Sequence, residues 1–337
     1  MQANLSKNLS RAVLAAILLL PVAAGAETKI EPLELTGQTT IHDPATIFKE
    51  GGRYYVFGTG PGIRVRASSN LVDWVEGPQV FARPLEWTTN AVPEFKGHTW
   101  APDLIRINGL WHLYFSVSSF GKQVSAMGLV TSPTLDWTSP DYRWTDHGPV
   151  IRSKVGDPYN AIDPSVMLDS DGKLWMAYGS FWKGIYLIEL DAKTGLRRDT
   201  NAAPTRLAWN EMIEAVCLVK NADYYYAFVN WGKCCSGTNS TYEVRVGRSK
   251  KVTGPYLDRE GKDLVDRGGT MFLETTGRFI GPGHIGVLPE GGTNWFSYHY
   301  YDGENRGRSK LAIGKLEWTP DGWPVAKSPG GSSNEAR

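Results

Sequence analysis

Five short motifs carry the side chains of this sequence that are best suited to acid–base chemistry. Each motif places one carboxylate or imidazole beside small or apolar residues. The five ionisable residues are Asp43, Asp103, Asp163, Glu214 and His284. When carboxylates lie close together, burial and mutual repulsion separate their pKa values, so one can donate a proton while another accepts one. If the fold brings these motifs together, they predict a site for hydrolysis by a general acid and a general base.

The spacing of the motifs indicates which elements must position them. The intervals between the five residues are 60, 60, 51 and 70, and an aromatic run follows each motif. These runs cover residues 53–58, 110–116, 174–179, 224–229 and 294–300. A further strand-like run follows each one, and a repeat of this length with three or four strands is typical of a propeller blade. We therefore expect an all-β fold, a five-bladed β-propeller over residues 27–325. The alternative is a β-sandwich or two packed β domains.

A propeller would gather the five motifs in one place. The innermost strand of every blade lines the central channel. If the motifs begin these strands, their ionisable side chains converge at one end of the channel. Four carboxylates and an imidazole in one funnel repel one another and lose solvation, which favours a functional site over a purely structural arrangement.

Composition excludes several other classes of protein. Of the 337 residues, 12% are aromatic and 21% are charged. The aromatic fraction is too high, and the charged fraction too low, for a disordered chain or a coiled coil. Lys and Arg total 36 against 35 for Asp and Glu. No strong field therefore points to nucleic acid, and we expect no nucleic-acid partner.

Residues 1–26 have the features of a secretory signal peptide. Lys7 and Arg11 precede an apolar run, and Ala24-Gly25-Ala26 supplies a small-residue cleavage site. The run is shorter than the roughly 20 residues that a membrane span needs. We expect a secreted or periplasmic protein that is monomeric, has no membrane contact after cleavage, and ends in a flexible tail over residues 326–337.

The cysteines are sparse. The chain has Cys217, Cys234 and Cys235, which make neither a disulfide framework nor a zinc motif. The adjacent pair Cys234-Cys235 could form a vicinal disulfide in an oxidising compartment or remain as two free thiols, and the sequence leaves both open.

Carboxylates in a funnel, many aromatic residues and predicted export together suggest a glycoside hydrolase, because aromatic faces stack on sugars and paired carboxylates cleave glycosidic bonds. Specific motifs point the same way. They are HDP (42–44), TWAPD (99–103), NAIDPS (160–165), YGSFWKGI (178–185), IEA (213–215), CCSGTNSTY (234–242), RVGRS (245–249), GPGH (281–284) and HYYD (299–302). On these motifs the chain resembles glycoside hydrolase family 43 and, within it, the endo-α-1,5-L-arabinanases, which cleave arabinan, a side chain of plant pectin.

The resemblance implies hydrolysis with inversion of configuration and three acidic roles. Asp43 would be the general base that activates water, and Glu214 the general acid that protonates the glycosidic oxygen. Asp163 would raise the pKa of Glu214 and orient it. An inverting pair should lie roughly 6.5–9.5 Å apart to admit the water. For Asp103, hydrogen bonds that secure its own blade are the favoured reading, with a direct catalytic role as the alternative.

The resemblance also implies a set of binding residues. The residues expected to bind substrate are His42, Trp100, Phe120, Asn160, Ser180, Phe181 and Trp182. His284 would lie beside a metal, calcium by resemblance, on the propeller axis, with water completing the coordination shell. The alternative is a metal-free histidine that only donates or accepts hydrogen bonds. Among the other histidines, His299 is the first candidate for a role in the site.

The favoured function is cleavage of internal α-1,5-L-arabinofuranosidic bonds. Within the same class, the alternatives are an exo-acting arabinanase, an α-L-arabinofuranosidase or a β-xylosidase. A non-catalytic carbohydrate-binding propeller is a second alternative, although Asp43, Asp163 and Glu214 are all present. A retaining furanosidase is a third, and it would require a carboxylate separation of about 5–5.5 Å.

Overall fold

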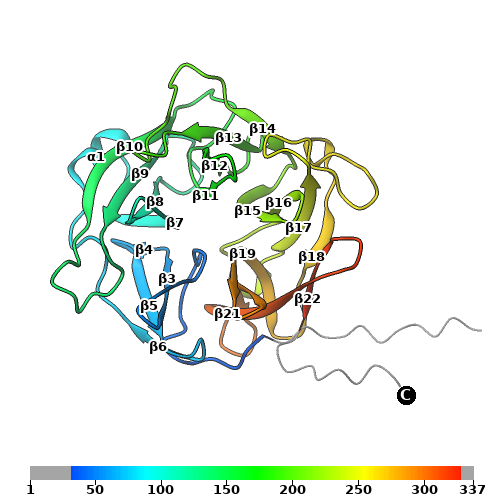
Figure 1. Ribbon diagram of the computed structural model, residues 1–337, viewed down its shortest axis with the longest axis horizontal. Coiled ribbons are helices and arrows are strands. Elements are labelled where there is room, and N and C mark those ends of the chain that lie inside the picture. The colour runs from blue at the N-terminus through cyan, green and yellow to red at the C-terminus, as the bar shows by residue number, and fades with distance from the viewer. Residues whose placement is uncertain (1–31, 328–337) are drawn as a thin grey trace, which may run out of the picture.

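The computed structural model describes residues 32–327. The predicted signal peptide, residues 1–26, and residues 328–337 of the predicted tail lie outside this range. Five sheets stand around a central axis like the blades of a propeller (Figure 1). The predicted all-β, five-bladed β-propeller is therefore confirmed. Within residues 32–327, no helix is long and apolar enough to cross a membrane.

The first two blades follow each other along the chain. The first contains, from the axis outwards, β2 (Phe48–Glu50), β3 (Arg53–Gly58), β5 (Arg64–Ser68), β6 (Asp73–Glu76) and β1 (Thr36–Gly37). The second contains β4 (Gly60–Pro61), β7 (His98–Ile107), β8 (Leu110–Val117), β9 (Ser125–Ser132) and β10 (Thr145–Ser153). The short helix α1 (Glu86–Ala91) lies between β6 and β7 in the sequence.

The other three blades are antiparallel sheets of four strands, each made from one stretch of chain. The third is β11 (Ser165–Leu168), β12 (Leu174–Tyr178), β13 (Ile185–Leu190) and β14 (Thr205–Ala208). The fourth is β15 (Ile213–Asn221), β16 (Tyr224–Trp231), β17 (Glu243–Ser249) and β18 (Thr270–Leu273), with the 3₁₀ turns η1 (Gly237–Asn239) and η2 (Leu264–Asp266) in its loops. The fifth is β19 (Phe279–Glu290), β20 (Thr293–Asp302), β21 (Arg308–Trp318) and β22 (Pro324–Lys327). The last strand ends at Lys327, so residues 326 and 327 belong to the last blade and not to the tail that was predicted to begin at residue 326.

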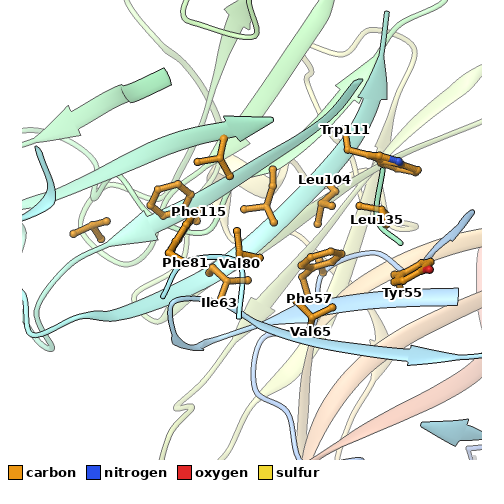
Figure 2. Packing of buried hydrophobic residues seen from close by; sticks show 14 of the residues in the cluster. Tyr55, Phe57, Ile63, Val65, Val80, Phe81, Leu104, Trp111, Phe115 and Leu135 are labelled. Carbon is orange, nitrogen blue, oxygen red and sulfur yellow. The ribbon is translucent and has the colours of Figure 1, made fainter. Parts of the chain in front are cut away.

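Leaving aside the two-residue β4, the aromatic runs of the sequence form the second strand of each blade, counted from the axis. These strands are buried on both faces because neighbouring blades cover them, so continuous aromatic and β-branched residues suit them better than alternation. Figure 2 shows the interface between the first two blades, where Tyr55 and Phe57 of β3 lie near Leu104, Trp111 and Phe115. Burying a side chain of this size contributes roughly 1.5–3 kcal/mol. The interfaces between blades are therefore the core of the protein.

The predicted inter-blade aromatics lie at these interfaces. Trp111 packs between the first and second blades, and Trp175 between the third and fourth. Tyr224 packs between the fourth and fifth blades, and Tyr54 and Trp295 where the fifth meets the first. Most of the aromatic excess of the sequence is thus used to hold the ring together.

The ring closes by contact between the first and last blades. A cluster at this junction joins Ile41 and Val56 of the first blade to Leu288 and Leu311 of the fifth. The segment before β2 adds two backbone hydrogen bonds, from Leu33 N–H to Ile313 O and from Leu311 N–H to Thr39 O, both 2.8 Å. Among the described residues, no strand from one end of the chain is inserted into the sheet of the other end.

Candidate active site

One backbone feature recurs at the start of every blade. A non-glycine residue takes a left-handed conformation at the head of each innermost segment, which is uncommon and indicates a position fixed by its surroundings. The five residues and their φ angles are Asp43 (47°), Ala101 (43°), Asp163 (60°), Ala215 (54°) and His284 (57°). At this conformation the strand breaks its regular pairing, as the register shifts in β7, β15 and β19 show. The break turns the side chains near it toward the axis.

Each left-handed residue is held by the preceding blade. For four of the five, the backbone N–H donates to a polar side chain from the end of the second strand of that blade. The four such bonds are Ala101 to Thr59 Oγ1 (2.8 Å), Asp163 to Ser116 Oγ (3.0 Å), His284 to Asn230 Oδ1 (3.0 Å) and Asp43 to His299 Nδ1 (3.2 Å). Because a buried N–H without a partner is costly, these polar side chains fix the turns that carry the site.

The third blade breaks this pattern in an informative way. Its equivalent of Thr59 is Gly179, since Gly179 N–H donates to Ile162 O just as Thr59 N–H donates to His42 O. Glycine has no side chain to accept the next N–H. Instead the carboxylate of Asp163 accepts from Ala215 N–H, at 3.3 Å. Asp163 is thereby tied to the backbone that carries Glu214.

The five turns surround a groove of about 620 Å³ at one end of the axis. All three predicted catalytic carboxylates line it: Asp43, Asp163 and Glu214. Of the other predicted site residues, His42, Trp100, Phe120 and His284 also line it. The convergence expected from the spacing of the motifs is therefore present for Asp43, Asp163, Glu214 and His284, whereas Asp103 does not line the groove. Acids from three different blades thus meet in one cavity.

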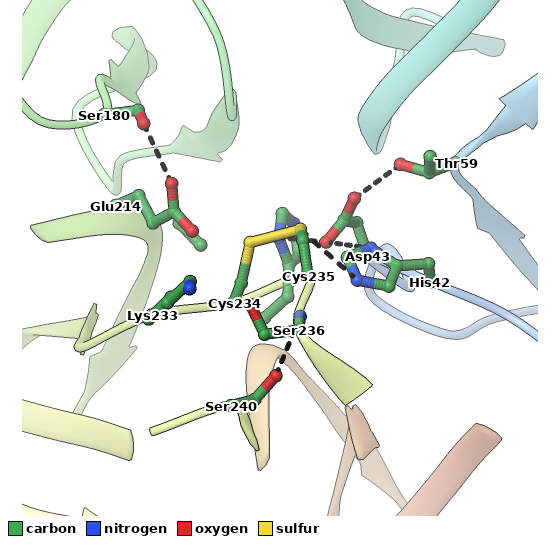
Figure 3. The surroundings of a disulfide bond; sticks show 12 residues. His42, Asp43, Thr59, Ser180, Glu214, Lys233, Cys234, Cys235, Ser236 and Ser240 are labelled. Carbon is green, nitrogen blue, oxygen red and sulfur yellow. Dashed lines mark hydrogen bonds and ion pairs between the residues drawn. A yellow bond between two sulfur atoms is a disulfide. The ribbon is translucent and has the colours of Figure 1, made fainter. Parts of the chain in front are cut away.

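Asp43 lies among hydrogen-bond donors. Thr59 Oγ1 donates to Asp43 Oδ2 at 2.6 Å, and His42 Nδ1 lies 2.8 Å from Oδ1 (Figure 3). The ring nitrogens Nδ1 of His284 and His299 lie 3.6 and 3.8 Å from the same oxygen. Burial alone would raise the pKa of Asp43, but the attraction and hydrogen bond of His42 outweigh it and hold that pKa far below its ordinary value. Asp43 is therefore ionised and can act as a base.

The three histidines around Asp43 differ in charge. Burial lowers the pKa of both His284 and His299, so these two rings are neutral near pH 7. Burial also lowers the pKa of His42, but the charge and the hydrogen bond of Asp43 raise it by more, so the pKa of His42 lies above its ordinary value. Asp43 therefore favours the protonated ring of His42, and His42 is the largest single contributor that favours the ionised carboxylate of Asp43.

The remaining two acids form a coupled pair. Asp163 and Glu214 are 7% and 8% exposed. Burial raises the pKa of Asp163 well above its ordinary value, and the nearby charge of Glu214 raises it further. Burial also raises the pKa of Glu214, although Tyr242 and Ser180 donate hydrogen bonds that oppose the shift. Because two buried neighbouring carboxylates resist double ionisation, the pair retains one proton, which the two residues share.

Two side chains orient Glu214. Ser180 Oγ donates to Glu214 Oε2 at 2.9 Å, and the buried Tyr242 donates a second hydrogen bond. The ring of Tyr242 lies against Gly283, where even a methyl group would come within 2.3 Å of the ring. Ser180 was expected to contact substrate; the structure instead places it on the acid, outside the lining of the groove.

The adjacent cysteines form a disulfide in the wall of the groove. Figure 3 shows this bond from Cys234 to Cys235 near Asp43 and Glu214. The backbone N–H of Cys235 donates to the Tyr301 hydroxyl at 2.6 Å, and that hydroxyl lies 2.7 Å from His42 Nε2. Of the two states left open by the sequence, the structure has the disulfide, and it links that loop to the histidine beside Asp43.

Asp103 plays a different part from the other acids. Its Oδ2 accepts from the backbone N–H of Val166 in the third blade, at 2.8 Å. Burial raises its pKa to about 7. Asp103 lies below the groove lining, in a small hollow on the axis. The sequence predicted hydrogen bonds within the blade of Asp103 itself. The hydrogen bond to Val166 instead joins the second blade to the third.

The predicted substrate-binding residues divide into two groups. Trp100 is half-buried in the groove and donates from Nε1 to His98 Nδ1 at 3.1 Å, whereas Phe120 is 80% exposed. Three others do not line the groove: Asn160, Phe181 and Trp182. Asn160 is buried, and its Oδ1 accepts from Ser125 Oγ at 2.6 Å, which locks the loop before the third blade.

The donor set near His284 determines what metal could bind. Within residues 32–327, the side chains close enough to share an ion are His42, Asp43 and His299, and His284 is outside this group. His299 Nδ1 accepts a backbone N–H, so its buried Nε2 carries the proton and cannot ligate. Calcium prefers six to eight oxygen ligands. The neutral ring of His284 fits calcium only as a single ligand, with water supplying the remainder.

Several residues of the site were not predicted. Thr59, Tyr242 and Tyr301 contact the acids or His42, and Arg64 and His98 also line the groove. His299 had been singled out only as a candidate. The repeat contained a usable signal, because Thr59, Ser116, Asn230 and His299 occupy the same place at the end of each second strand.

Comparison with known proteins extends the likeness over the whole ring. The sequence profile of the family described as Glycosyl hydrolases family 43 matches residues 36–324. The chain is similar to an extracellular endo-α-(1→5)-L-arabinanase of Bacillus subtilis, at 40% identity over 323 residues, covering 94% of this chain and 95% of that protein. It is similar to an extracellular exo-α-(1→5)-L-arabinofuranosidase of Cellvibrio japonicus, at 39% identity over 301 residues, covering 85% and 86%.

A solved structure adds a ligand to the comparison. Cellvibrio cellulosa α-L-arabinanase complexed with arabinohexaose has a TM-score of 0.82 and 38% identity, covering 86% of this chain and 96% of that one. The fold and the sequence therefore match together along nearly all of the described residues.

Proposed function

This chain belongs to Glycosyl hydrolases family 43 and is a glycosidase, and we propose that it cleaves internal α-1,5 bonds of L-arabinan. The observation that carries the proposal is the division of charge in the groove. An ionised Asp43 faces a buried pair, Asp163 and Glu214, that retains a proton. This is the arrangement that a base and an acid on one glycosidic bond require.

In the proposed mechanism Asp43 removes a proton from water as the water attacks the anomeric carbon. His42 and Thr59 orient the carboxylate for this step. Glu214, oriented by Ser180 and Tyr242, gives its proton to the departing oxygen. Asp163 keeps the proton on the pair until that moment. Direct attack by water inverts the anomeric configuration, because no covalent sugar–enzyme intermediate forms.

The choice of internal cleavage is supported by the Bacillus subtilis endo-acting relative, which the chain matches over 94% of its length. Exo-acting cleavage is the second candidate, since the Cellvibrio japonicus relative with exo activity in its name is almost as similar. Phe120, largely exposed at the groove, offers a sugar-stacking face for either mode.

Analysis of products over time on linear arabinan decides between the two modes. Internal attack gives an early spread of oligosaccharides and a rapid fall in viscosity, whereas attack from an end gives a single short product and little change in viscosity. Glu214→Gln serves as the control, and we expect its turnover to fall by about a thousandfold. Unchanged turnover in this variant would contradict the assignment of the acid. Proton NMR of the first product measures whether its configuration is inverted.

Export belongs to the proposal as well. Both relatives are named extracellular, and residues 1–26 have the pattern of a signal peptide. We propose that the mature chain acts as a monomer outside the cytoplasm, in the medium or the periplasm, on a polysaccharide too large to enter cells.

We also propose that His284 holds a calcium ion through one ring nitrogen, with water as its other ligands. A bound ion stabilises the folded state by mass action, so a chelator should lower the thermal unfolding midpoint by a few degrees and added calcium should restore it. His284→Ala should show the lower midpoint without chelator and no response to it. An identical midpoint of the wild-type protein in chelator and in calcium contradicts the proposal.

A further inference from the structure

A second hollow lies at the opposite end of the blades from the acids. It measures about 480 Å³ and borders the fourth and fifth blades. Glu214 begins β15 and pairs with Asn230 near the end of β16, whereas Tyr224 begins β16 and pairs with Asn221 at the end of β15. Tyr224 lines the second hollow. The hollow is thus separated from the groove by the length of a blade.

Four cations line this hollow: Arg248, Lys250, Lys251 and Arg259. Its one acidic lining residue, Asp258, is engaged by its own loop. Its carboxylate accepts three backbone N–H groups, from Glu260 (3.0 Å), Lys262 (2.8 Å) and Gly269 (2.8 Å). Asp258 therefore shapes the loop, and its single negative charge is outnumbered by the four cations. The lining keeps a net positive charge in a protein whose total charge is close to zero.

Two of the cations have ion-pair partners at the rim. Lys250 lies 3.6 Å from Asp223, and Arg259 lies 3.1 Å from Asp321. These pairs are exposed and contribute little. Among the residues that the structure describes, neither Arg248 nor Lys251 forms an ion pair. Both are available to an anion.

Arg248 is held in place before any ligand arrives. Its guanidinium lies 4.5 Å from the ring centre of Tyr224 and 4.5 Å from that of Trp323. One Nη1–H donates to Asp321 O at 2.6 Å, and the backbone of Arg248 forms two hydrogen bonds with Leu257. A fixed guanidinium loses little freedom on binding and presents its remaining N–H groups as a fork that matches a carboxylate.

Apolar surface accompanies the charge. Leu257, 39% exposed, lines the same hollow as the half-buried ring of Tyr224, whose centre also lies 3.8 Å from Lys250 Nζ. Inorganic phosphate would need only the cations, whereas a sugar also needs flat apolar contacts for its C–H face. The combination fits a carboxylated sugar better than a bare anion. The cavity is also within the size range of small-molecule sites.

We propose that this hollow, lined by Arg248, Lys251, Tyr224 and Leu257, is a non-catalytic binding site for uronic acid residues of an acidic polysaccharide. The identification of the partner rests on the proposed function, because arabinan chains are attached to pectin, whose backbone contains galacturonic acid. Binding the backbone here would leave the groove at the opposite end free for the neutral side chain. The second site would raise the local concentration of enzyme at its substrate.

The test measures binding of a short oligogalacturonate to the full-length protein by calorimetry at low ionic strength. We expect Lys251→Glu to weaken binding about tenfold, since an exposed, unpaired cation is replaced by a repelling charge. Arg248→Lys should weaken it several-fold, because the charge stays but the fork is lost. The matched control is Lys193→Glu, another exposed lysine that forms no ion pair within residues 32–327, whose affinity should remain within about twofold of the wild type.

Three results would overturn the proposal. The first is equal affinity in Lys251→Glu and wild type, and the second is an equal loss in Lys193→Glu, which indicates charge alone. The third is binding of inorganic phosphate or anionic phospholipid vesicles as tight as that of oligogalacturonate, which indicates an anion or membrane site. Hydrolysis of linear arabinan is measured in parallel and should be equal in wild type and Lys251→Glu. If wild type fails to hydrolyse arabinan, the proposed function fails while the binding result stands.

Discussion

At the scale of single residues, the groove separates charge by giving chemically similar acids different neighbours. Asp43 has the ring of His42 and a threonine hydroxyl as hydrogen-bond partners, so it stays ionised. Asp163 and Glu214 have each other and little water, so they keep a proton. Residue type alone does not set the protonation state of these acids; the groups that surround each carboxylate do.

Asp163→Asn tests the shared proton. Removing the Asp163 charge lowers the pKa of Glu214, so the acid loses its proton at a lower pH. In the proposed mechanism activity requires that proton, so the alkaline limb of kcat/KM against pH should move to lower pH, whereas Asp43, whose pKa lies far below its ordinary value, stays ionised across the range tested. The rate at the optimum should also fall about tenfold or more. Hydrolysis of linear arabinan across pH 4–9 measures both effects.

A control separates this effect from general damage to the fold. Glu86→Gln changes an exposed carboxylate on α1, remote from the groove lining, and should leave both limbs unchanged. If Asp163→Asn lowers the rate but leaves the alkaline limb where it was, Asp163 does not act through the pKa of Glu214.

At the scale of elements, the left-handed turn at the head of each blade positions the chemistry. The sequence allowed the blades and the three carboxylates to be predicted, because motif and aromatic strand recur in phase. It did not reveal Thr59, Tyr242 or Tyr301, since these polar residues lie on the later strands and loops, outside the motif that marks the repeat. Their role depends on contacts between blades, which sequence spacing does not report.

The same limit explains the binding residues that face elsewhere. Asn160 and Ser180 flank Asp163 in the sequence, but Ser125 and Glu214 engage them, respectively. A motif can be retained because its residues support the site from behind. The disulfide could not be settled from the sequence either, since adjacent cysteines are compatible with both thiols and a bond.

Asp103 offers a test of how blades are joined. Its pKa is about 7 in the folded protein and about 3.8 as an unperturbed group. Between these values the folded state binds more proton than the unfolded state, so the free energy of unfolding should fall as pH rises from about 4 to 7. Asp103→Asn cannot ionise, yet its side-chain oxygen can still accept the Val166 N–H. The variant should lack this part of the decline.

Denaturant unfolding of both proteins at pH 5 and pH 8 measures the difference. The other titrating groups are common to both, so the change in stability between the two pH values isolates Asp103. Between pH 5 and pH 8 we expect the free energy of unfolding to fall less in Asp103→Asn than in wild type, by a difference on the order of 1–3 kcal/mol. An identical pH dependence would show that Asp103 is not buried as an acid in solution.

At the scale of the whole molecule, the proposed base and the proposed acid depend on different parts of the ring. Asp163 belongs to the third blade and Glu214 to the fourth, and these two blades follow each other in the chain. His42 and Asp43 belong to the first blade but are held by His299 and Tyr301 of the fifth. The junction between the first and last blades is closed by side chains and a few hydrogen bonds rather than by an inserted strand.

Two buried leucines, each in the third strand of its blade, test this junction. Leu311 of β21 packs between the last and first blades, and Leu187 of β13 packs between the third and fourth. Either change to Ala should cost about 2–5 kcal/mol. Leu311→Ala should also lose activity at temperatures where its circular dichroism is still native, whereas Leu187→Ala should lose both together. Parallel loss in both variants would contradict a locally weak junction.

The closure of the ring has a practical consequence for engineering. If the first step of heat inactivation is a local parting of the end blades, turnover will fail before the protein aggregates, and on cooling it should recover. Consensus substitutions scattered over the blades would then raise the melting temperature without extending the half-life of activity at high temperature. A single cross-link between the segment at residues 33–39 and β21, which already share backbone hydrogen bonds, is the change most suited to lengthen it.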